Sequence, residues 1–182
     1  MSDPAPILFN SLDSALQTLR TGQSAPTPLF PGGTHEQRLP GDVFLHSDPA
    51  LRAEGTWASP RGRLLEIVVQ IHQPGRWLAL HVPLPRTDLA GVTWLALALR
   101  TSAVRATAIR PCLRSGVTQG FRDDFFPLAV LAQPRESDHL DQIAPARMPD
   151  LPPEAAWREL ILFLPPASDQ HLALHELRLV TL

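Results

Sequence analysis

The end of the chain constrains the fold more than any other segment. Residues 156–180 hold two apolar runs separated by Pro165-Pro-Ala-Ser-Asp169, and the second run places leucines at 172, 174, 177 and 179. Alternation with a period of two puts successive side chains on opposite faces of a β-strand. The chain is therefore expected to end inside an antiparallel sheet, with binding rather than catalysis as the default expectation.

The same alternation continues through most of the chain, from Gly41 onward. Turn residues separate the apolar runs, and Gln73-Pro-Gly75 and Ser102-Ala103 predict hairpins between consecutive strands. About eight to ten strands at regular spacing predict an all-β, antiparallel jelly-roll sandwich. The expected strands cover residues 43–45, 63–71, 76–82, 92–100, 104–114 and 125–132, followed by the two terminal runs.

Composition supports this fold and excludes several classes of protein. The chain has 20 prolines, about twice the average usage, and proline is confined to strand edges, strand starts and turns. A net charge of −2 argues against a nucleic-acid binder, which needs a basic surface. The single Cys112 excludes an intrachain disulfide and a thiolate metal cluster.

Residues 1–40 differ from the rest and are expected to form a helix and a proline-rich arm beside a domain over 41–182. Segment 24–33 is expected to be extended without regular structure. The helix and arm either pack across the domain, the alternative we favour, or grip a protein partner. The helix is predicted from leucines at helical spacing followed by a glycine stop: Leu12, Leu16, Leu19 and Gly22.

Two further features concern location and loops. No apolar run approaches the ~20 residues of a membrane span, and the N-terminus lacks the basic and apolar parts of a secretory signal. We therefore expect cytoplasmic synthesis, with any release on a particle or by lysis. The polar, proline-rich stretch over 133–153 predicts a long connection, either a functional loop or a crossover between sheets.

Five segments together resemble a known group of domains: 77–82, 94–100, 110–114, 121–126 and 157–165. Their order is similar to that of galactose-binding-like domains and carbohydrate-binding modules, in which a Trp-x-x-Leu-x-Leu-x-Leu-Pro strand precedes the last strand. The resemblance is one of pattern over about residues 41–182 and implies a jelly roll that binds glycans.

The spacing of the histidines argues against a metal site, and the sequence lacks the known catalytic motifs. His171 and His175 have the separation of a helical zinc motif, but on a strand that separation is about 13 Å. His72 and His81 lack the close His-x-His spacing of barrel metal enzymes, and Cys112 is expected to be a small core residue. No phosphate loop or nucleophile elbow is present. We therefore expect no enzymatic activity and no cofactor.

A tryptophan–arginine face is the leading candidate for sugar binding. If the strands on either side of Ser102-Ala103 pair, Arg100 lies opposite Arg105, and small alanines leave a shallow depression beside a tryptophan. The alternative is that the N-terminal helix packs on these small residues. In both cases, one face of the predicted strand over 92–100 carries Trp94, Ala96, Ala98 and Arg100.

Two other places are candidates for ligand binding. Trp57, near Gly55 and Pro60, is a second candidate platform. In the 119–126 segment, Asp123 and Asp124 are adjacent carboxylates that could hold a structural calcium ion or orient sugar hydroxyls. The interpretation we prefer there is an Arg–Asp ion pair that closes a turn.

Two functions remain open from the sequence. The first is a non-catalytic glycan-binding module. The second is a structural or assembly subunit of a larger particle, such as a phage-like head decoration or spike, docking through residues 1–40. The predicted ligand-binding residues are Trp57, Trp94, Arg100, Arg105, Arg122, Asp123 and Asp124.

Overall fold

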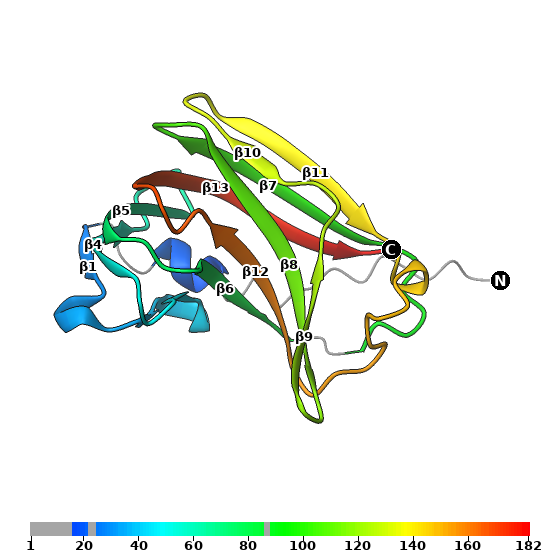
Figure 1. The fold of residues 1–182 in the computed structure, drawn as a ribbon. Coiled ribbons are helices and arrows are strands. Elements are labelled where there is room, and N and C mark those ends of the chain that lie inside the picture. Colours follow the sequence, from blue (N-terminus) through cyan, green and yellow to red (C-terminus); the bar gives the residue numbers. More distant parts are fainter. Residues whose placement is uncertain (1–15, 22–24, 86–87) are drawn as a thin grey trace.

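The computed structural model describes residues 16–21, 25–85 and 88–182, which form a sandwich of two antiparallel sheets (Figure 1). The first sheet has the strand order β1 (Thr27–Leu29), β4 (Arg52–Ala58), β5 (Leu65–Gln73), β13 (Gln170–Thr181), β7 (Leu95–Ala103) and β11 (Ser137–Ile143). The second has the order β10 (Val130–Ala132), β8 (Thr107–Val117), β12 (Arg158–Leu164), β6 (Leu78–Leu84), β3 (Phe44–Ser47) and β2 (Glu36–Arg38), and β9 (Gly120–Phe125) pairs with β8. The predicted antiparallel jelly-roll sandwich is confirmed.

Strand β13 lies in the middle of the first sheet, between β5 and β7. Its leucines face the interior and are buried, as the alternation predicts. The spacing skips one residue between Leu174 and Leu177, and the strand pairing shifts at the same place. A β-bulge of this kind inserts one extra residue and lets both halves of the strand keep their leucines inside. The buried terminal strand is therefore confirmed.

At the two predicted hairpins the chain crosses from one sheet to the other. Strands β5 and β6 belong to different sheets, and so do β7 and β8, and β12 and β13. The hairpins predicted at residues 73–75 and 102–103 are therefore wrong. Both an arch between sheets and a hairpin within one sheet reverse the chain and use the same turn residues, so local sequence does not distinguish them.

The described part of the N-terminal segment belongs to the sandwich. Strands β1 and β2 pair within the first and second sheets, so the absence of regular structure expected over 24–33 is wrong. Residues 16–21 are helical, as predicted, whereas Leu12 lies outside the described residues. Side chains from this segment join the same core cluster as the strands of both sheets: Leu16, Leu19, Leu29, Phe30 and Leu39.

The polar stretch over 133–153 contains strand β11, which forms one edge of the first sheet beside β7. The long irregular connection expected there is therefore wrong for residues 137–143. An edge strand with one solvated face has the polar composition of a loop, because only every second residue packs inward. Two other short elements, η1 (Pro31–Gly33) and η2 (Pro40–Asp42), flank β2, and η3 (Pro145–Arg147) follows β11. In the described ranges, no helix is long and apolar enough to cross a membrane.

The buried carboxylate of Asp48 joins two turns at one end of the sandwich. It accepts hydrogen bonds from the backbone N–H groups of Ala50 (2.9 Å) and Arg76 (2.9 Å) and from Nε of Arg76 (2.8 Å). The Ala50 N–H, followed by the Arg76 side chain and backbone, lowers the pKa of Asp48 to about 2. The ionised side chain therefore stabilises the fold.

We predict that Asp48→Asn lowers stability at neutral pH and flattens its dependence on acid. Because the folded-state pKa is depressed, the contribution is present above the unfolded value of about 3.9 and is lost as the pH falls through about 2. Guanidinium chloride unfolding at pH 7, 4 and 2 measures this. The exposed carboxylate variant Glu154→Gln should keep the wild-type profile, and equal acid slopes for Asp48→Asn and wild type would contradict the prediction.

Candidate functional site

The structure places Trp57 in the core. Its side chain is 5% exposed and faces inward, on the same side of the first sheet as its register partner Ile67. A ring in this position cannot stack on a sugar at the surface, so the structure argues against a platform at Trp57.

The predicted tryptophan–arginine face is only partly assembled. Trp94 and Arg100 do lie on the outer face of the first sheet, but Arg105 is exposed in the turn between β7 and β8 and is not opposite Arg100. Arg100 instead donates from Nε to Asp138 Oδ1 of strand β11 at 2.8 Å. The guanidinium of Arg147 lies 5.9 Å from the Trp94 ring centre.

The acidic pair on β9 points to two sides of the second sheet. Asp123 faces outward and forms a two-fold contact with Arg114, at 2.6 and 2.7 Å. Asp124 faces the opposite way, and its burial raises its pKa. Two carboxylates on opposite faces cannot share a calcium ion. Arg122 lies 3.9 Å from Asp124, as the preferred Arg–Asp pair implied, and contacts Asp150 at 2.7 Å, while the pair that links β8 to β9 is Arg114 with Asp123.

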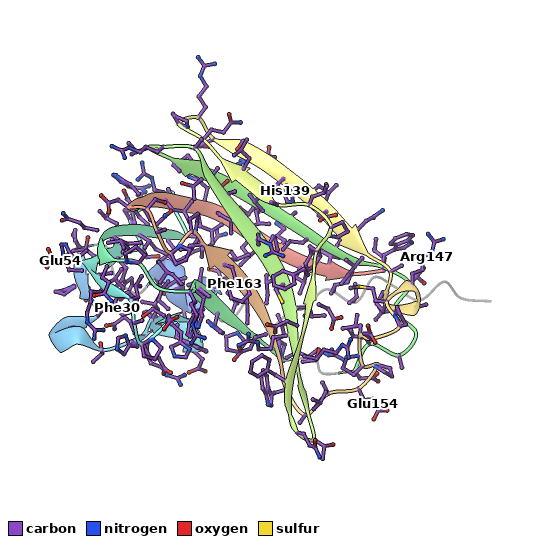
Figure 2. The ribbon with its side chains drawn as sticks, viewed as in Figure 1. Phe30, Glu54, His139, Arg147, Glu154 and Phe163 are labelled. Carbon is purple, nitrogen blue, oxygen red and sulfur yellow. The ribbon has the colours of Figure 1, made fainter. Side chains whose placement is uncertain are left out.

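The outer face of the second sheet carries a concentration of aromatic side chains that sequence reasoning missed. Three of the rings are well exposed: Phe121 by 55%, Phe125 by 37% and Trp157 by 41%. In Figure 2, Phe163 lies over β12 near the middle of the sandwich. We call this surface the aromatic face and define it by eight side chains: Phe44, His46, Trp77, His81, Phe121, Phe125, Trp157 and Phe163.

The register of the strands builds this face. One row across the sheet runs from β3 through β6, β12 and β8 to β9, and consists of Phe44, His81, Ile161, Cys112 and Phe125. The middle of the face is completely buried, because Ala79, Cys112 and Ile161 pack beneath the larger side chains around them. Burial raises the pKa of the Cys112 thiol, in keeping with a core residue. The rings thus stand on an apolar floor.

Ring–ring contacts hold the aromatic face in place. Phe44 stacks on His81 with ring centres 4.5 Å apart, and Phe125 contacts Phe163 at 5.7 Å. His46 meets Trp77 edge-on at 4.6 Å. Burial, followed by the neighbouring His81, lowers the pKa of His46, so this ring is neutral at neutral pH.

A glycine makes room for the most exposed indole. A Cβ atom at Gly116 would lie 2.4 Å from Nε1 of Trp157. The two segments are joined by hydrogen bonds from Gly116 N–H to the Trp157 carbonyl (2.9 Å) and from Ala156 N–H to the Gly116 carbonyl (3.2 Å). The indole therefore lies directly against the backbone of β8. A glycine inside a strand indicates such a close approach, and this was the signal available in the sequence.

The buried Arg158 anchors the segment that carries Trp157. Its guanidinium donates to Ser115 Oγ, to the carbonyl of Pro152 and, at 3.1 Å, to that of Pro153. Burial lowers the pKa of Arg158. A single buried side chain thus ties the proline-rich connection to the sheet and fixes the position of the indole next to it.

Charged side chains between the rings are held in pairs. The Arg114 guanidinium, bound to Asp123, also lies 3.8 Å from the ring centre of Phe121. His81 Nδ1 lies 2.8 Å from Glu159 Oε2. These contacts hold hydrogen-bonding groups in fixed positions between aromatic surfaces.

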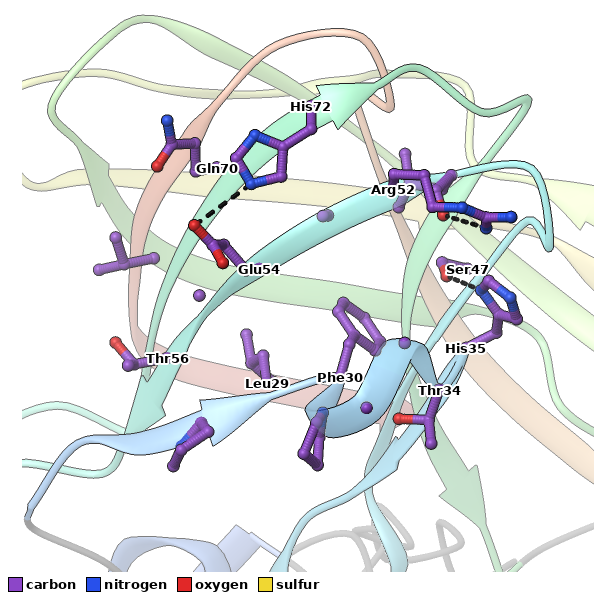
Figure 3. Close-up of a pocket in the computed structure, with 18 residues that line it drawn as sticks. Leu29, Phe30, Thr34, His35, Ser47, Arg52, Glu54, Thr56, Gln70 and His72 are labelled. Carbon is purple, nitrogen blue, oxygen red and sulfur yellow. Dashed lines mark hydrogen bonds and ion pairs between the residues drawn. The ribbon is translucent and has the colours of Figure 1, made fainter.

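A separate cavity of about 850 Å³ opens at the other sheet (Figure 3). It lies between η1 and the outer side of β4 and β5, and Glu54 Oε1 and His72 Nε2 lie 3.2 Å apart on adjacent strands of its floor. His171 and His175, which are far apart on β13, contact Glu66 (3.0 Å) and Ser102 (2.9 Å) respectively. Among the residues whose structure is described, no group of three or more His, Cys, Asp or Glu side chains could hold a metal ion.

Comparison with known proteins shows the fold. No family model and no curated protein matches the sequence. A family 11 carbohydrate-binding module from Clostridium thermocellum, in complex with a β-1,3-1,4-mixed-linked tetrasaccharide, superposes with a TM-score of 0.50 and 13% identity over 86% of this chain and 95% of that one. A CBM4 structure gives 0.55 and 7% identity over 78% and 87%. The enzymatically active domain of bacteriophage CBA120 tailspike protein 4 gives 0.50 and 11% over 77% and 19%. The chain has the β-jelly-roll fold of carbohydrate-binding modules, as the resemblance implied.

We predict that Gly116→Ala displaces the Trp157 indole. The added methyl group has no space, so the ring should move into solvent, red-shift the tryptophan emission and cost about 1–3 kcal/mol of stability. Fluorescence and chemical unfolding measure the two effects. In a Trp157→Phe background the same substitution should leave the emission unchanged, and a red shift of equal size there would contradict the assignment to Trp157.

Proposed function

We propose that the protein is a non-catalytic module that binds a glycan on the aromatic face. The observation that carries the proposal is the exposure of Phe121, Phe125 and Trp157 on one side of one sheet. Contiguous exposed apolar surface in a folded protein marks an interaction site. The C–H groups on one face of a pyranose ring form a flat apolar surface, which an aromatic ring covers by stacking.

The rings are held ready for such a ligand. Trp157 rests on the glycine backbone of β8, and Phe121 is held beneath the Arg114 guanidinium. Side chains that are already fixed lose little conformational entropy when a ligand binds, which favours affinity. A ligand that lies across the strands would meet successive rings at fixed places.

The polar groups of the face complement the hydroxyl groups of a sugar. Asp123 and Glu159 are held by Arg114 and His81, and a carboxylate held in this way still has lone pairs to accept from hydroxyls. The guanidinium of Arg110 lies 4.2 Å from the ring centre of Phe125 and supplies donors beside a stacking surface. Stacking and hydrogen bonding together are sufficient for recognition without covalent chemistry.

The fold supports the proposal. A module of the same fold was solved with a mixed-linked tetrasaccharide, so a jelly roll of this kind is a suitable scaffold for a glycan. Its sequence is only 13% identical, and the choice of glycan by this chain rests on its own side chains.

We predict that Trp157→Ala and Phe121→Ala each weaken glycan binding about tenfold, since a truncated aromatic anchor costs more than 1 kcal/mol and about 1.4 kcal/mol is tenfold. Isothermal titration calorimetry with mixed-linkage β-glucan, xylan and other neutral polysaccharides measures this.

Two variants on the first sheet serve as controls. Leu140→Ala removes a side chain that is 72% exposed on the outer face of β11, and Trp94→Ala removes the half-buried tryptophan that precedes β7. Both should retain wild-type affinity. Loss of binding in Trp94→Ala with full binding in Trp157→Ala and Phe121→Ala would move the site to the first sheet and overturn the proposal.

A further inference from the structure

We propose that the cavity beside η1 is a second saccharide site, which binds a neutral sugar mainly through hydrogen bonds (Figure 3). We call it the η1 pocket and define it by residues 28–35 together with the outer-facing side chains of β4 and β5. It extends the proposed function from one site to two and rests on that function for its class of ligand. Its volume of about 850 Å³ falls within the range of small-molecule sites, roughly 300–1,000 Å³.

The η1 pocket is independent of the aromatic face. Its floor is formed by outward-facing side chains of β4 and β5 of the first sheet, with Ser47 of β3 as its one lining residue from a second-sheet strand, whereas the aromatic face lies on the outer side of the second sheet. In Figure 2, Phe30 and Glu54 lie at the end of the sandwich that holds β1 and β4, away from Phe163 over β12. The hydrophobic core separates the two surfaces, so one sugar ring cannot touch both.

One wall of the η1 pocket is a firmly anchored turn. Leu29 and Phe30 are buried in the main core, and the N–H of Gly33 donates to the Phe30 carbonyl at 3.1 Å. Phe30 has a left-handed backbone with φ of 52°, a conformation that costs a non-glycine residue about 1–3 kcal/mol and persists where the surrounding structure holds it. Gly32 and Gly33, at φ of 69° and 77°, leave open space where side chains would stand.

The floor of the η1 pocket offers groups that both donate and accept hydrogen bonds. Thr56 lies opposite Val68, and Glu54 lies opposite Gln70, on adjacent strands. A hydroxyl and an amide each donate and accept, as every sugar hydroxyl does. Val68 provides a small apolar surface beside them for the C–H groups of the ring. Because these side chains stand on paired strands, their spacing is fixed before a ligand arrives.

The charged groups of the η1 pocket already have partners. Glu54 Oε1 contacts His72 Nε2 at 3.2 Å. Arg52 Nη1 donates to the carbonyls of Pro49 at 2.8 Å and Leu51 at 3.2 Å, so its guanidinium is turned toward the backbone. Bonds to neutral carbonyls leave the guanidinium charged, but the lining holds one such cation and one carboxylate, so the two charges balance when the histidines are neutral. This favours a neutral polyhydroxylated ligand.

Amide NMR titration of the full chain tests the inference. The probes are glucose, galactose, mannose, xylose, the mixed-linked β-1,3-1,4-glucan tetrasaccharide and xylotetraose. Amides of residues 32–34 and 54–56 should shift on addition of at least one of these saccharides. Glucuronate should bind there no more tightly than glucose, since the lining carries a carboxylate, Glu54, as well as the guanidinium of Arg52.

The variants separate the two sites. A Thr56→Val/Gln70→Ala double variant should weaken the response of the pocket amides at least fivefold, and Thr34→Val, a change in the opposite wall, should weaken it independently. Gln142→Ala changes an exposed amide on β11 of the same sheet and should have no effect. Dispersion of the amide spectrum reports that each variant is folded.

The outcomes also separate the two proposals. Pocket shifts that persist in Trp157→Ala support a second site. No shift of the pocket amides with any probe, or a shift that the pocket variants leave unchanged, overturns the second site and leaves the aromatic face in place. A response confined to the η1 pocket and unaffected by Trp157→Ala overturns the proposed function and leaves this inference standing.

Discussion

The packing of two sheets over one aliphatic core is the constraint on which the rest of this structure depends. Every long strand places one set of side chains inside, and β13, with its bulge, does so from the centre of the first sheet. Burying each leucine contributes about 1.5–3 kcal/mol. The inward side chains must be apolar because they are buried, whereas the outward side chains of the same strands can be polar or aromatic and can contact a ligand. The composition of these outward side chains differs between the two sheets.

The outward sets of the two sheets have different chemistry. On the second sheet the strands present rings above a buried apolar floor at Ala79, Cys112 and Ile161. On the first sheet they present alanines, His–Glu contacts and the polar η1 pocket. The aromatic surface of the second sheet suits stacking, and the polar surface of the first sheet suits hydrogen bonding. A two-layer fold can thus hold two recognition surfaces that share only the core between them.

The tryptophan–arginine face is not assembled as the sequence predicted, and the reason is the strand pairing. If consecutive strands had formed hairpins, Arg100 and Arg105 would have been neighbours. Strand β7 instead pairs with β11 and β13, and β8 pairs with β12, so that Arg100 meets Asp138 and Trp157 meets Gly116. Asp123 was expected at a site and does lie on the outer side of β9 beside the rings, but its partner Arg114 could be named only from the register.

The sequence by itself determined the all-β class, the approximate strand positions, the short N-terminal helix and the burial of the terminal leucines. These depend on local periodicity, which a single strand displays without its neighbours. Only the tertiary structure decided which strands pair, and therefore that Phe121, Phe125 and Trp157 share one face and that Trp57 is internal. The physical reason is that a period of two assigns each side chain to one of two sides, while core packing decides which side is buried and which strand lies next to it.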